Sequence, residues 1–215
     1  MRRVRSWWSS LPCVAVNTCL CVAFTTPRSA AAEPHAWPRW GGPHGDFKVE
    51  AKGLAEKWPD GGPRRLWSRP LGPGYSAIVA GSGRLYTMYR DGDRDVVIAL
   101  NAADGKTIWE HGYTAKPLKG QRLDFGTGPN ATPLLLGDRL IAAGFTGVLK
   151  CLSTETGKPL WSHDLVAEFG GKVQEFGYSA SPLPYKGNVI VLVGGDRSGV
   201  MALDPADGRV VWKSA

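Results

Sequence analysis

The chain has 215 residues, enough for one domain or two, and a formal net charge of +7. Residues 1–32 hold four arginines and no acidic residue, and the rest of the chain holds 22 basic and 19 acidic residues. This near balance provides no basic patch of the kind that a nucleic-acid-binding surface requires. We therefore expect no nucleic-acid partner.

The N-terminus has the pattern of a secretory signal peptide. Three arginines open the chain, a mostly apolar stretch follows over residues 11–24, and Ala30-Ala31-Ala32 then provides a small-residue cleavage site. The apolar stretch is too short for a permanent membrane-spanning helix, and no later segment could span a membrane. We expect a signal peptide over 1–32 and an exported protein, periplasmic or secreted. Cleavage between Ala32 and Glu33 would make Glu33 the first residue in N-terminal sequencing of the exported protein.

A unit of about 50 residues occurs three times in the remaining chain. Its most regular parts are residues 97–109, 149–161 and 200–212, whose final tryptophans are 52 and 51 residues apart. A leucine, a glycine and a tryptophan hold equivalent positions in each copy: Leu100, Gly105 and Trp109; Leu152, Gly157 and Trp161; Leu203, Gly208 and Trp212. Self-similarity at this period is the signature of a repeat architecture.

Each copy has the pattern of strand, turn and strand. The leucine ends an apolar strand, an Asn, Ser or Asp starts the turn, and the glycine suits a positive φ as the chain leaves it. Two further strands are expected upstream in each copy: residues 76–79 and 84–89, 131–135 and 139–143, and 180–184 and 188–193. Four short strands per repeat, with no sustained 3.6-residue apolar period, predict an all-β protein made of β-propeller blades.

The pattern Ala-Leu-Asp-x-x-(Asp/Thr)-Gly-(Lys/Arg)-x-x-Trp resembles the tryptophan-docking motif of the pyrroloquinoline-quinone (PQQ) repeat family of β-propellers. In that family the tryptophan of each outer strand packs between neighbouring blades. The resemblance implies this role for Trp109, Trp161 and Trp212. Residues 64–68, with Trp67, resemble a lone outer strand, and the segment from Trp37 resembles the lead-in of exported members.

The resemblance implies a lead-in over 33–63 and propeller repeats over 64–215. Rings of this family close with seven or eight blades, which would need roughly 360–410 residues. We therefore expect about three four-stranded blades of such a ring, in an incomplete chain that associates through its uncovered blade faces. The alternative is a small propeller assembled from several chains.

Several chemical motifs favour structural interpretations. Cys151 aligns with Ala99 and Ala202, which favours a buried, inert thiol over a reactive one. Residues 91–95 lack the glycine and glutamate of a calcium loop, so we expect a charged hairpin turn there. The four histidines show no metal-ligand spacing, and we expect His163 at an ordinary strand end.

Three aromatic residues lie on expected loops: Tyr75, Phe125 and Tyr178. They can face the axis of the propeller. However, Gly-Tyr-Ser occurs at both 74–76 and 177–179, and this recurrence favours a structural role. Asn130 begins a glycosylation sequon, but its repeat position suggests the start of a strand.

Enzymes of the PQQ family need Ca²⁺ held by carboxylate and amide ligands, an aspartate base and commonly a vicinal cysteine pair. This sequence has no adjacent cysteines and marks no aspartate as the base, so we assign no catalytic, cofactor-binding or metal-binding residue. We expect a non-catalytic binding or scaffold module with protein partners, similar to the propeller subunit of the outer-membrane β-barrel assembly machinery. That subunit is a lipoprotein, and Thr18 and Leu20, before Cys19 and Cys21, are too bulky for such processing. The alternative is a fragment of a PQQ- and calcium-dependent alcohol dehydrogenase.

Overall fold

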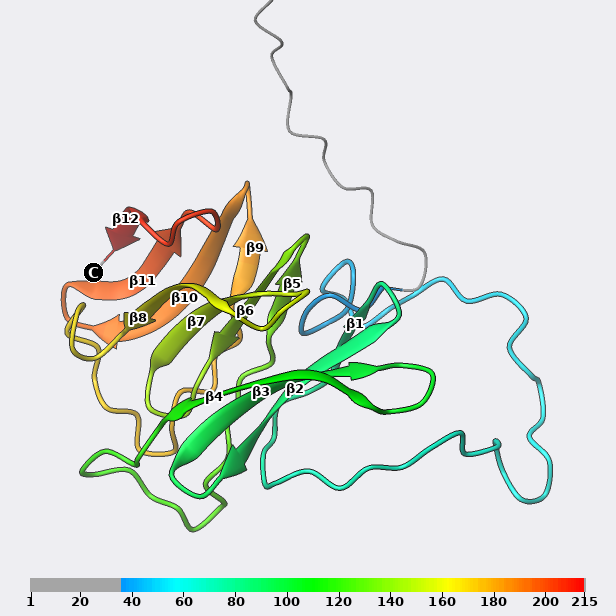
Figure 1. The fold of residues 1–215 in the computed structure, drawn as a ribbon. Helices are drawn as coiled ribbons and strands as arrows, with labels where there is room; N and C mark the ends of the chain where they lie inside the picture. The colour runs from blue at the N-terminus through cyan, green and yellow to red at the C-terminus, as the bar shows by residue number, and fades with distance from the viewer. Residues whose placement is uncertain (1–35, 215) are drawn as a thin grey trace, which may run out of the picture. The chain divides into compact units, whose positions relative to one another are not determined.

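The computed structural model describes residues 36–214, which form three antiparallel sheets of four strands each (Figure 1). The first sheet holds β1 (Val79–Gly81), β2 (Arg84–Asp91), β3 (Arg94–Asn101) and β4 (Thr107–Thr114). The second holds β5 (Leu134–Leu136), β6 (Arg139–Ala143), β7 (Val148–Ser153) and β8 (Pro159–Asp164). The third holds β9 (Leu183–Tyr185), β10 (Asn188–Gly195), β11 (Ser198–Leu203) and β12 (Val210–Ser214). Within each sheet the strands pair in chain order, so each sheet is one blade, and the expected all-β fold of four-stranded blades is confirmed.

The expected signal peptide and its cleavage site lie outside the described residues.

The repeated leucine and glycine shape the outer turn of each blade. Leu100, Leu152 and Leu203 are buried and pair across the sheet with an apolar residue of the preceding strand. The turn that follows is closed by a side-chain oxygen, for example Asn101 Oδ1, which accepts from Ala103 N at 2.8 Å. The repeated glycine then takes φ values of 69°, 68° and 78° in the three blades, a region that other residues adopt only with strain.

The innermost strands are shorter than expected and start later in the chain. Each comprises three residues, and the segments before them, predicted as strand from residues 76, 131 and 180, pair with no strand of their own blade. Their N–H groups bond across blades instead. Ala77 N donates to Thr132 Oγ1 at 3.3 Å, and Thr132 N donates to Ser181 Oγ at 2.9 Å. These prediction errors have a physical cause: hydroxyl groups of the next blade replace the ladder hydrogen bonds.

The prediction of an outer strand over residues 64–68 is also wrong. No strand is formed there, because no described strand pairs with this segment. The lead-in attaches elsewhere: Trp37 bridges to Ala80 of β1, and Leu135 N of β5 donates to Pro38 O at 2.7 Å. The start of the lead-in therefore lies beside the inner strands of the first two blades.

Three tryptophans each lie against a glycine of the following blade. A Cβ added to Gly105, Gly157 or Gly208 would lie 2.5, 2.5 or 2.7 Å from the indole of Trp67, Trp109 or Trp161, respectively. Each indole N–H also donates to a turn carbonyl of that blade, at 3.0 Å to Ala102, 2.9 Å to Thr154 and 3.0 Å to Pro205. The repeated glycine thus has a second function besides its positive φ, since only a residue without Cβ admits the indole. Trp212 has no such glycine among the described residues and is partly exposed.

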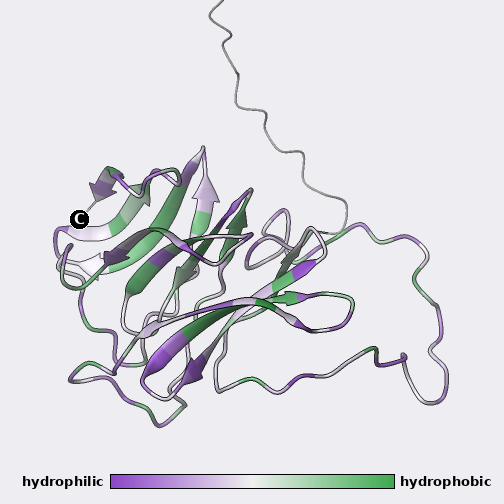
Figure 2. Cartoon of the chain, in the orientation of Figure 1, coloured by the Kyte–Doolittle hydropathy of each residue, from purple (hydrophilic) through white to green (hydrophobic). Residues whose placement is uncertain are grey.

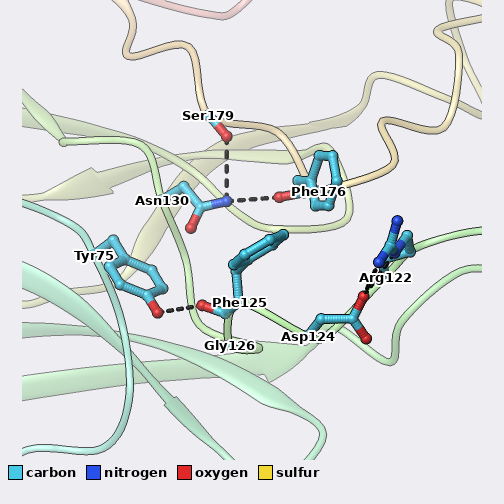
Figure 3. A pocket seen from close by; sticks show the side chains of 8 residues that line it. All are labelled: Tyr75, Arg122, Asp124, Phe125, Gly126, Asn130, Phe176 and Ser179. Atoms are coloured by element: carbon cyan, nitrogen blue, oxygen red, sulfur yellow. Dashed lines mark hydrogen bonds and ion pairs between the residues drawn. The ribbon is translucent and has the colours of Figure 1, made fainter.

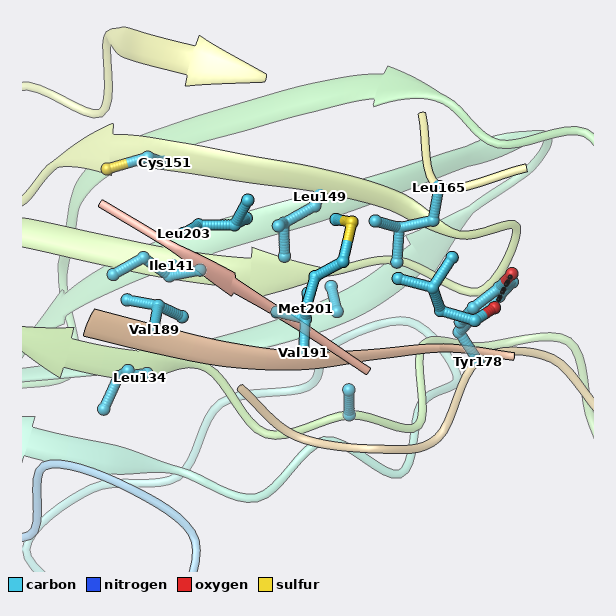
Figure 4. Close-up of a cluster of buried hydrophobic side chains, with 13 residues drawn as sticks. Leu134, Ile141, Leu149, Cys151, Leu165, Tyr178, Val189, Val191, Met201 and Leu203 are labelled. Carbon is cyan, nitrogen blue, oxygen red and sulfur yellow. Dashed lines mark hydrogen bonds between the residues drawn. The ribbon is translucent and has the colours of Figure 1, made fainter. Parts of the chain in front are cut away.

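Apolar side chains fill the space between adjacent blades. Hydrophobic residues concentrate on the strands, while the connecting segments are more hydrophilic (Figure 2). Between the second and third blades, buried residues of β6, β7, β10 and β11 form one cluster (Figure 4). Val97, Ala99 and Trp109 of the first blade pack with Leu140 and Leu152 of the second. Burial of these faces is the main stabilising contribution available to the described chain.

A buried ion pair joins the first blade to the second. Arg90 Nη1 lies 3.2 Å from Asp95 Oδ1, and Arg90 Nη2 donates to Ala115 O at 2.8 Å. Asp95 Oδ2 accepts from the backbone N–H of Phe145 at 2.8 Å. The expected hairpin turn over residues 91–95 is present, but Asp95 is fully buried rather than part of a charged surface.

Cys151 lies in the cluster between the second and third blades, where burial raises the pKa of its thiol to about 12. Alkylation requires the thiolate, so we expect Cys151 to resist iodoacetamide at pH 8 in the folded protein and to react fully after denaturation. Mass spectrometry of the Cys151 peptide measures this without interference from the other cysteines. Complete labelling of the native protein would contradict the buried position.

The described residues include no helix that is long and apolar enough to span a membrane.

Candidate functional site

The inner ends of the three blades meet at a pocket of about 720 Å³ (Figure 3). Three segments contribute to it: residues 72–78 before β1, the loop over 115–133 between β4 and β5, and the loop over 165–182 between β8 and β9. Its lining residues are Tyr75, Arg122, Asp124, Phe125, Gly126, Asn130, Phe176 and Ser179. The pocket is therefore built jointly by all three repeats.

Each blade supplies one lining residue from the same repeat position. Tyr75, Asn130 and Ser179 each stand four residues before the first residue of the innermost strand of their blade. Asn130 Nδ2 donates to Ser179 Oγ at 3.2 Å and to the carbonyl of Phe176 at 2.8 Å. The Asn130 amide, in the lining of the pocket, therefore joins the segment before β5 to the loop before β9.

Three aromatic rings are exposed around the pocket. The exposed fractions are 69% for Phe125, 64% for Tyr75 and 42% for Phe176. The rings of Phe125 and Phe176 meet edge to face, with centroids 5.5 Å apart, and the Tyr75 hydroxyl donates to the Phe125 carbonyl. Gathered aromatic rings that remain accessible to solvent are characteristic of binding surfaces.

Arg122 is held at one side of the pocket by two carboxylates. Its Nε donates to Asp124 Oδ2 at 2.7 Å, its Nη2 bonds the same oxygen, and its Nη1 lies 3.4 Å from Glu175 Oε1. Its guanidinium carbon is 5.6 Å from the centroid of the Phe176 ring, within the range of a cation–π contact. The arginine thus links the loop of the second blade to that of the third.

Backbone and amide contacts fix the two long loops against each other. Arg122 N donates to Glu175 O at 2.7 Å, and Gln121 Nε2 donates to Gln174 O at 3.4 Å. Gly126, at φ 109°, lies beside the Tyr75 hydroxyl, where a Cβ would come within 2.8 Å of the oxygen. These contacts place Phe125 and Phe176 in defined positions although neither belongs to a strand.

A second hollow of about 420 Å³ continues the pocket toward the lead-in. It shares Tyr75, Asn130 and Ser179 with the first and adds Trp40, whose ring is exposed. Arg39, also in this hollow, uses its guanidinium to hold its own glycine-rich loop by bonding the carbonyls of Gly42 and Pro43. The aromatic surface therefore extends onto the lead-in segment.

The structure separates the aromatic residues that the sequence grouped together. Tyr75 and Phe125 line the pocket, whereas Tyr178 is buried and donates to Val193 O at 3.0 Å. The two Gly-Tyr-Ser segments are thus not equivalent, since Tyr178 stands one residue before the position that Tyr75 occupies. Asn130 lies in the pocket and not in a strand. The strand-end position of His163 is confirmed, but its ring also contacts Glu168 and the carbonyl of Gly208 in the next blade.

Sequence reasoning missed Arg122, Asp124 and Phe176. They lie on loops that have no common register among the repeats, so no periodic signal marks them. An alternation of charged and apolar residues, Arg122 to Phe125 and Glu175-Phe176, was the available signal.

The residues of the pocket do not fit the calcium and quinone of the PQQ enzymes. Among residues 36–214, no three His, Cys, Asp or Glu side chains come together in a way that could hold a metal ion. The one carboxylate lining the pocket, Asp124, is engaged by Arg122. We therefore derive no reaction step through this cofactor.

Stacked four-stranded blades with a shared inner pocket define a β-propeller of the PQQ-repeat type. The family model described as outer membrane protein assembly factor BamB matches residues 93–215, and the chain belongs to this family. The expected family is confirmed.

Two curated relatives illustrate the range of proteins in which these repeats occur. A quinohemoprotein alcohol dehydrogenase ADH IIB from Pseudomonas putida is 29% identical over 121 residues, which are 54% of this chain and 17% of the relative. The outer membrane protein assembly factor BamB of Burkholderia pseudomallei is 27% identical over 120 residues, 55% of this chain and 27% of the relative. The chain thus aligns with less than a third of the length of either protein.

A solved structure with the same fold is the quinohemoprotein alcohol dehydrogenase from Comamonas testosteroni. It aligns with a TM-score of 0.50 and 22% identity, covering 66% of this chain and 21% of that protein. At this identity the likeness establishes the fold alone.

Proposed function

We propose that this chain is part of an exported, non-catalytic propeller that binds a partner protein at the pocket formed by the inner ends of its blades. The observation that carries the proposal is the convergence of three exposed aromatic rings from three separate segments. Aromatic side chains with few rotatable bonds are the typical anchors of protein interfaces, because they bury a large area at low entropic cost.

Export is supported by the sequence pattern over residues 1–32. A matched relative is described as an outer membrane protein assembly factor, which is consistent with a location outside the cytoplasm. Tight turns and buried blade interfaces supply the rigid support that a binding surface needs.

A photo-crosslinking experiment tests the binding role directly. A benzophenone amino acid replaces Phe125 in the protein produced by an exporting bacterial host, and the control places it at Trp58, which is similarly exposed at 62% but lines neither the pocket nor the adjoining hollow. We expect one defined protein adduct from position 125 and none from position 58. Equal labelling from both positions, or none from either, would remove the binding assignment.

The second candidate function is that of a PQQ- and calcium-dependent alcohol dehydrogenase, favoured by the relative with 29% identity. Because the pocket residues do not form a calcium site, we expect neither dye reduction with short primary alcohols nor submicromolar PQQ binding after addition of PQQ and Ca²⁺. Dye-reduction assays and isothermal titration calorimetry measure these two properties. Saturable turnover would favour the dehydrogenase function over the binding function.

A further inference from the structure

We propose that the pocket binds a cationic side chain, an arginine or lysine of the partner protein, among Tyr75, Phe125 and Phe176. This inference rests on the proposed binding function and names the chemistry of its ligand. It follows from three properties of the pocket: its exposed ring faces, its surplus of hydrogen-bond acceptors and its charge.

The rings are arranged to attract positive charge. The face of an aromatic ring carries partial negative charge, and several rings around one space form the aromatic cages that bind ammonium and guanidinium groups. Phe125 and Phe176 meet edge to face, so the face of one ring stays uncovered by the other, and Tyr75 lies on the opposite side of Phe125 (Figure 3).

The chain already places one guanidinium at this site. Arg122 lies 5.6 Å from the centroid of Phe176 and is oriented by Asp124 and Glu175. The site therefore accepts an arginine side chain in a specific geometry. Arg122 and Tyr75 lie on opposite sides of Phe125 (Figure 3). The pocket of about 720 Å³ that these residues line has room for a second cation.

The polar groups around the space are mainly acceptors. Asn130 Nδ2 uses its hydrogens on Phe176 O and Ser179 Oγ, and the Ser179 hydroxyl donates to Gly177 O. The Tyr75 hydroxyl donates to the Phe125 carbonyl. The carbonyl oxygen of Asn130 and the second carboxylate oxygen of Asp124, Oδ1, are thus the groups that remain to meet a ligand, since Arg122 bonds only Asp124 Oδ2. A ligand rich in donors, such as a guanidinium or an ammonium, matches them.

The charges around the pocket also favour a cationic ligand. Two carboxylates, Asp124 and Glu175, flank the single guanidinium of Arg122, so this cluster carries one net negative charge. The guanidinium of Arg39, in the adjoining hollow, bonds the carbonyls of its own loop instead. All three side chains of the cluster are about half exposed, and their effect on an incoming ligand is therefore moderate and sensitive to salt. A cation neutralises the cluster, whereas a carboxylate adds repulsion.

The test compares two peptides that differ in charge but hardly in shape, acetyl-Gly-Gly-Arg-Gly-Gly-amide and the same peptide with citrulline in place of arginine. Isothermal titration calorimetry or NMR shift titration of the full chain measures both dissociation constants. We expect the arginine peptide to bind about tenfold more tightly, and less so as salt rises. Equal affinities, or tighter binding of the citrulline peptide, would overturn the proposal.

Three variants test whether binding depends on the aromatic cage formed by Tyr75, Phe125 and Phe176. Phe125→Leu should weaken binding of the arginine peptide about fivefold and leave the citrulline peptide unchanged, while the control Trp58→Leu should change neither. Arg122→Gln should strengthen arginine binding, because it removes the competing internal cation and releases both carboxylates. Weaker binding in a folded Arg122→Gln variant would contradict the expected attraction of the two released carboxylates for a cation, and the proposal would fall.

The outcomes separate this inference from the proposed function. Crosslinking from position 125 without preference for arginine would retain the binding role and reject the cationic ligand. Binding of the protein to phosphatidylcholine vesicles, abolished by Phe125→Leu, would assign the cage to a lipid headgroup and also reject a peptide ligand. If a variant fails to fold, as judged by circular dichroism, the peptide pair on the unmodified chain still decides.

Discussion

Replacing Trp109 by alanine is expected to lower the free energy of unfolding by about 3–5 kcal/mol, the usual loss for a buried aromatic side chain. The indole is 8% exposed and packs on Gly157 of the next blade. It also donates to Thr154 O at 2.9 Å, and the truncation removes that bond together with the packing. Urea unfolding followed by circular dichroism measures the change.

Trp58→Ala is the matched control, because Trp58 lies in the lead-in and is 62% exposed. We expect that variant to unfold within about 0.5 kcal/mol of the unmodified protein. Trp161→Ala should fall between the two, because Trp161 makes the same contacts but is only partly buried. Similar urea midpoints for the Trp109 and Trp58 variants would show that the tryptophans do not hold the blades together.

Removing the carboxylate of Asp95 is expected to destabilise the protein by about 3–5 kcal/mol, since it removes the buried partner of a buried guanidinium. In Asp95→Ala, Arg90 retains Ala115 O, but the Phe145 N–H loses its acceptor. Burial raises the pKa of the Asp95 carboxyl, and the Phe145 N–H and the charge of Arg90 oppose that shift. The substitution Asp95→Ala therefore removes both the ion pair within the first blade and the hydrogen bond to the second blade.

Asp93→Ala is the control for this pair. Asp93 lies 3.8 Å from the same arginine, but its side chain is largely exposed, so its removal should cost less than about 1 kcal/mol. The double variant Arg90→Met with Asp95→Leu should be more stable than Asp95→Ala alone, because no buried charge remains. If Asp95→Ala and Asp93→Ala unfold at the same urea concentration, the buried pair contributes little.

The repeat motif was sufficient to predict the outer half of each blade. Leu152, Gly157 and Trp161 mark a strand end, a turn and a strand, and they do so because each has a separate physical requirement: burial, positive φ and a place for the indole. The inner strands were misplaced by about three residues. Their apolar pattern continues into segments whose hydrogen bonds go to Thr132 and Ser181 of neighbouring blades, and a local pattern holds no information on such partners.

The pocket was only partly predictable for a related reason. Tyr75 and Phe125 were recognised as aromatic residues on loops. Arg122 and Phe176 are 54 residues apart, on loops of different sequence, and their contact depends on how two blades pack. That packing is a tertiary property, and a periodic sequence signal describes only what the repeats have in common.

The contact between each tryptophan and the next glycine always runs in one direction along the chain. Trp67, Trp109 and Trp161 contact Gly105, Gly157 and Gly208 in turn. A blade copied by gene duplication therefore carries both residues of this contact. Its tryptophan packs on the glycine of the next blade, and its glycine receives the tryptophan of the preceding one. Whole blades can be added or lost in evolution without any new complementary surface, whereas the loops that form the pocket diverge freely.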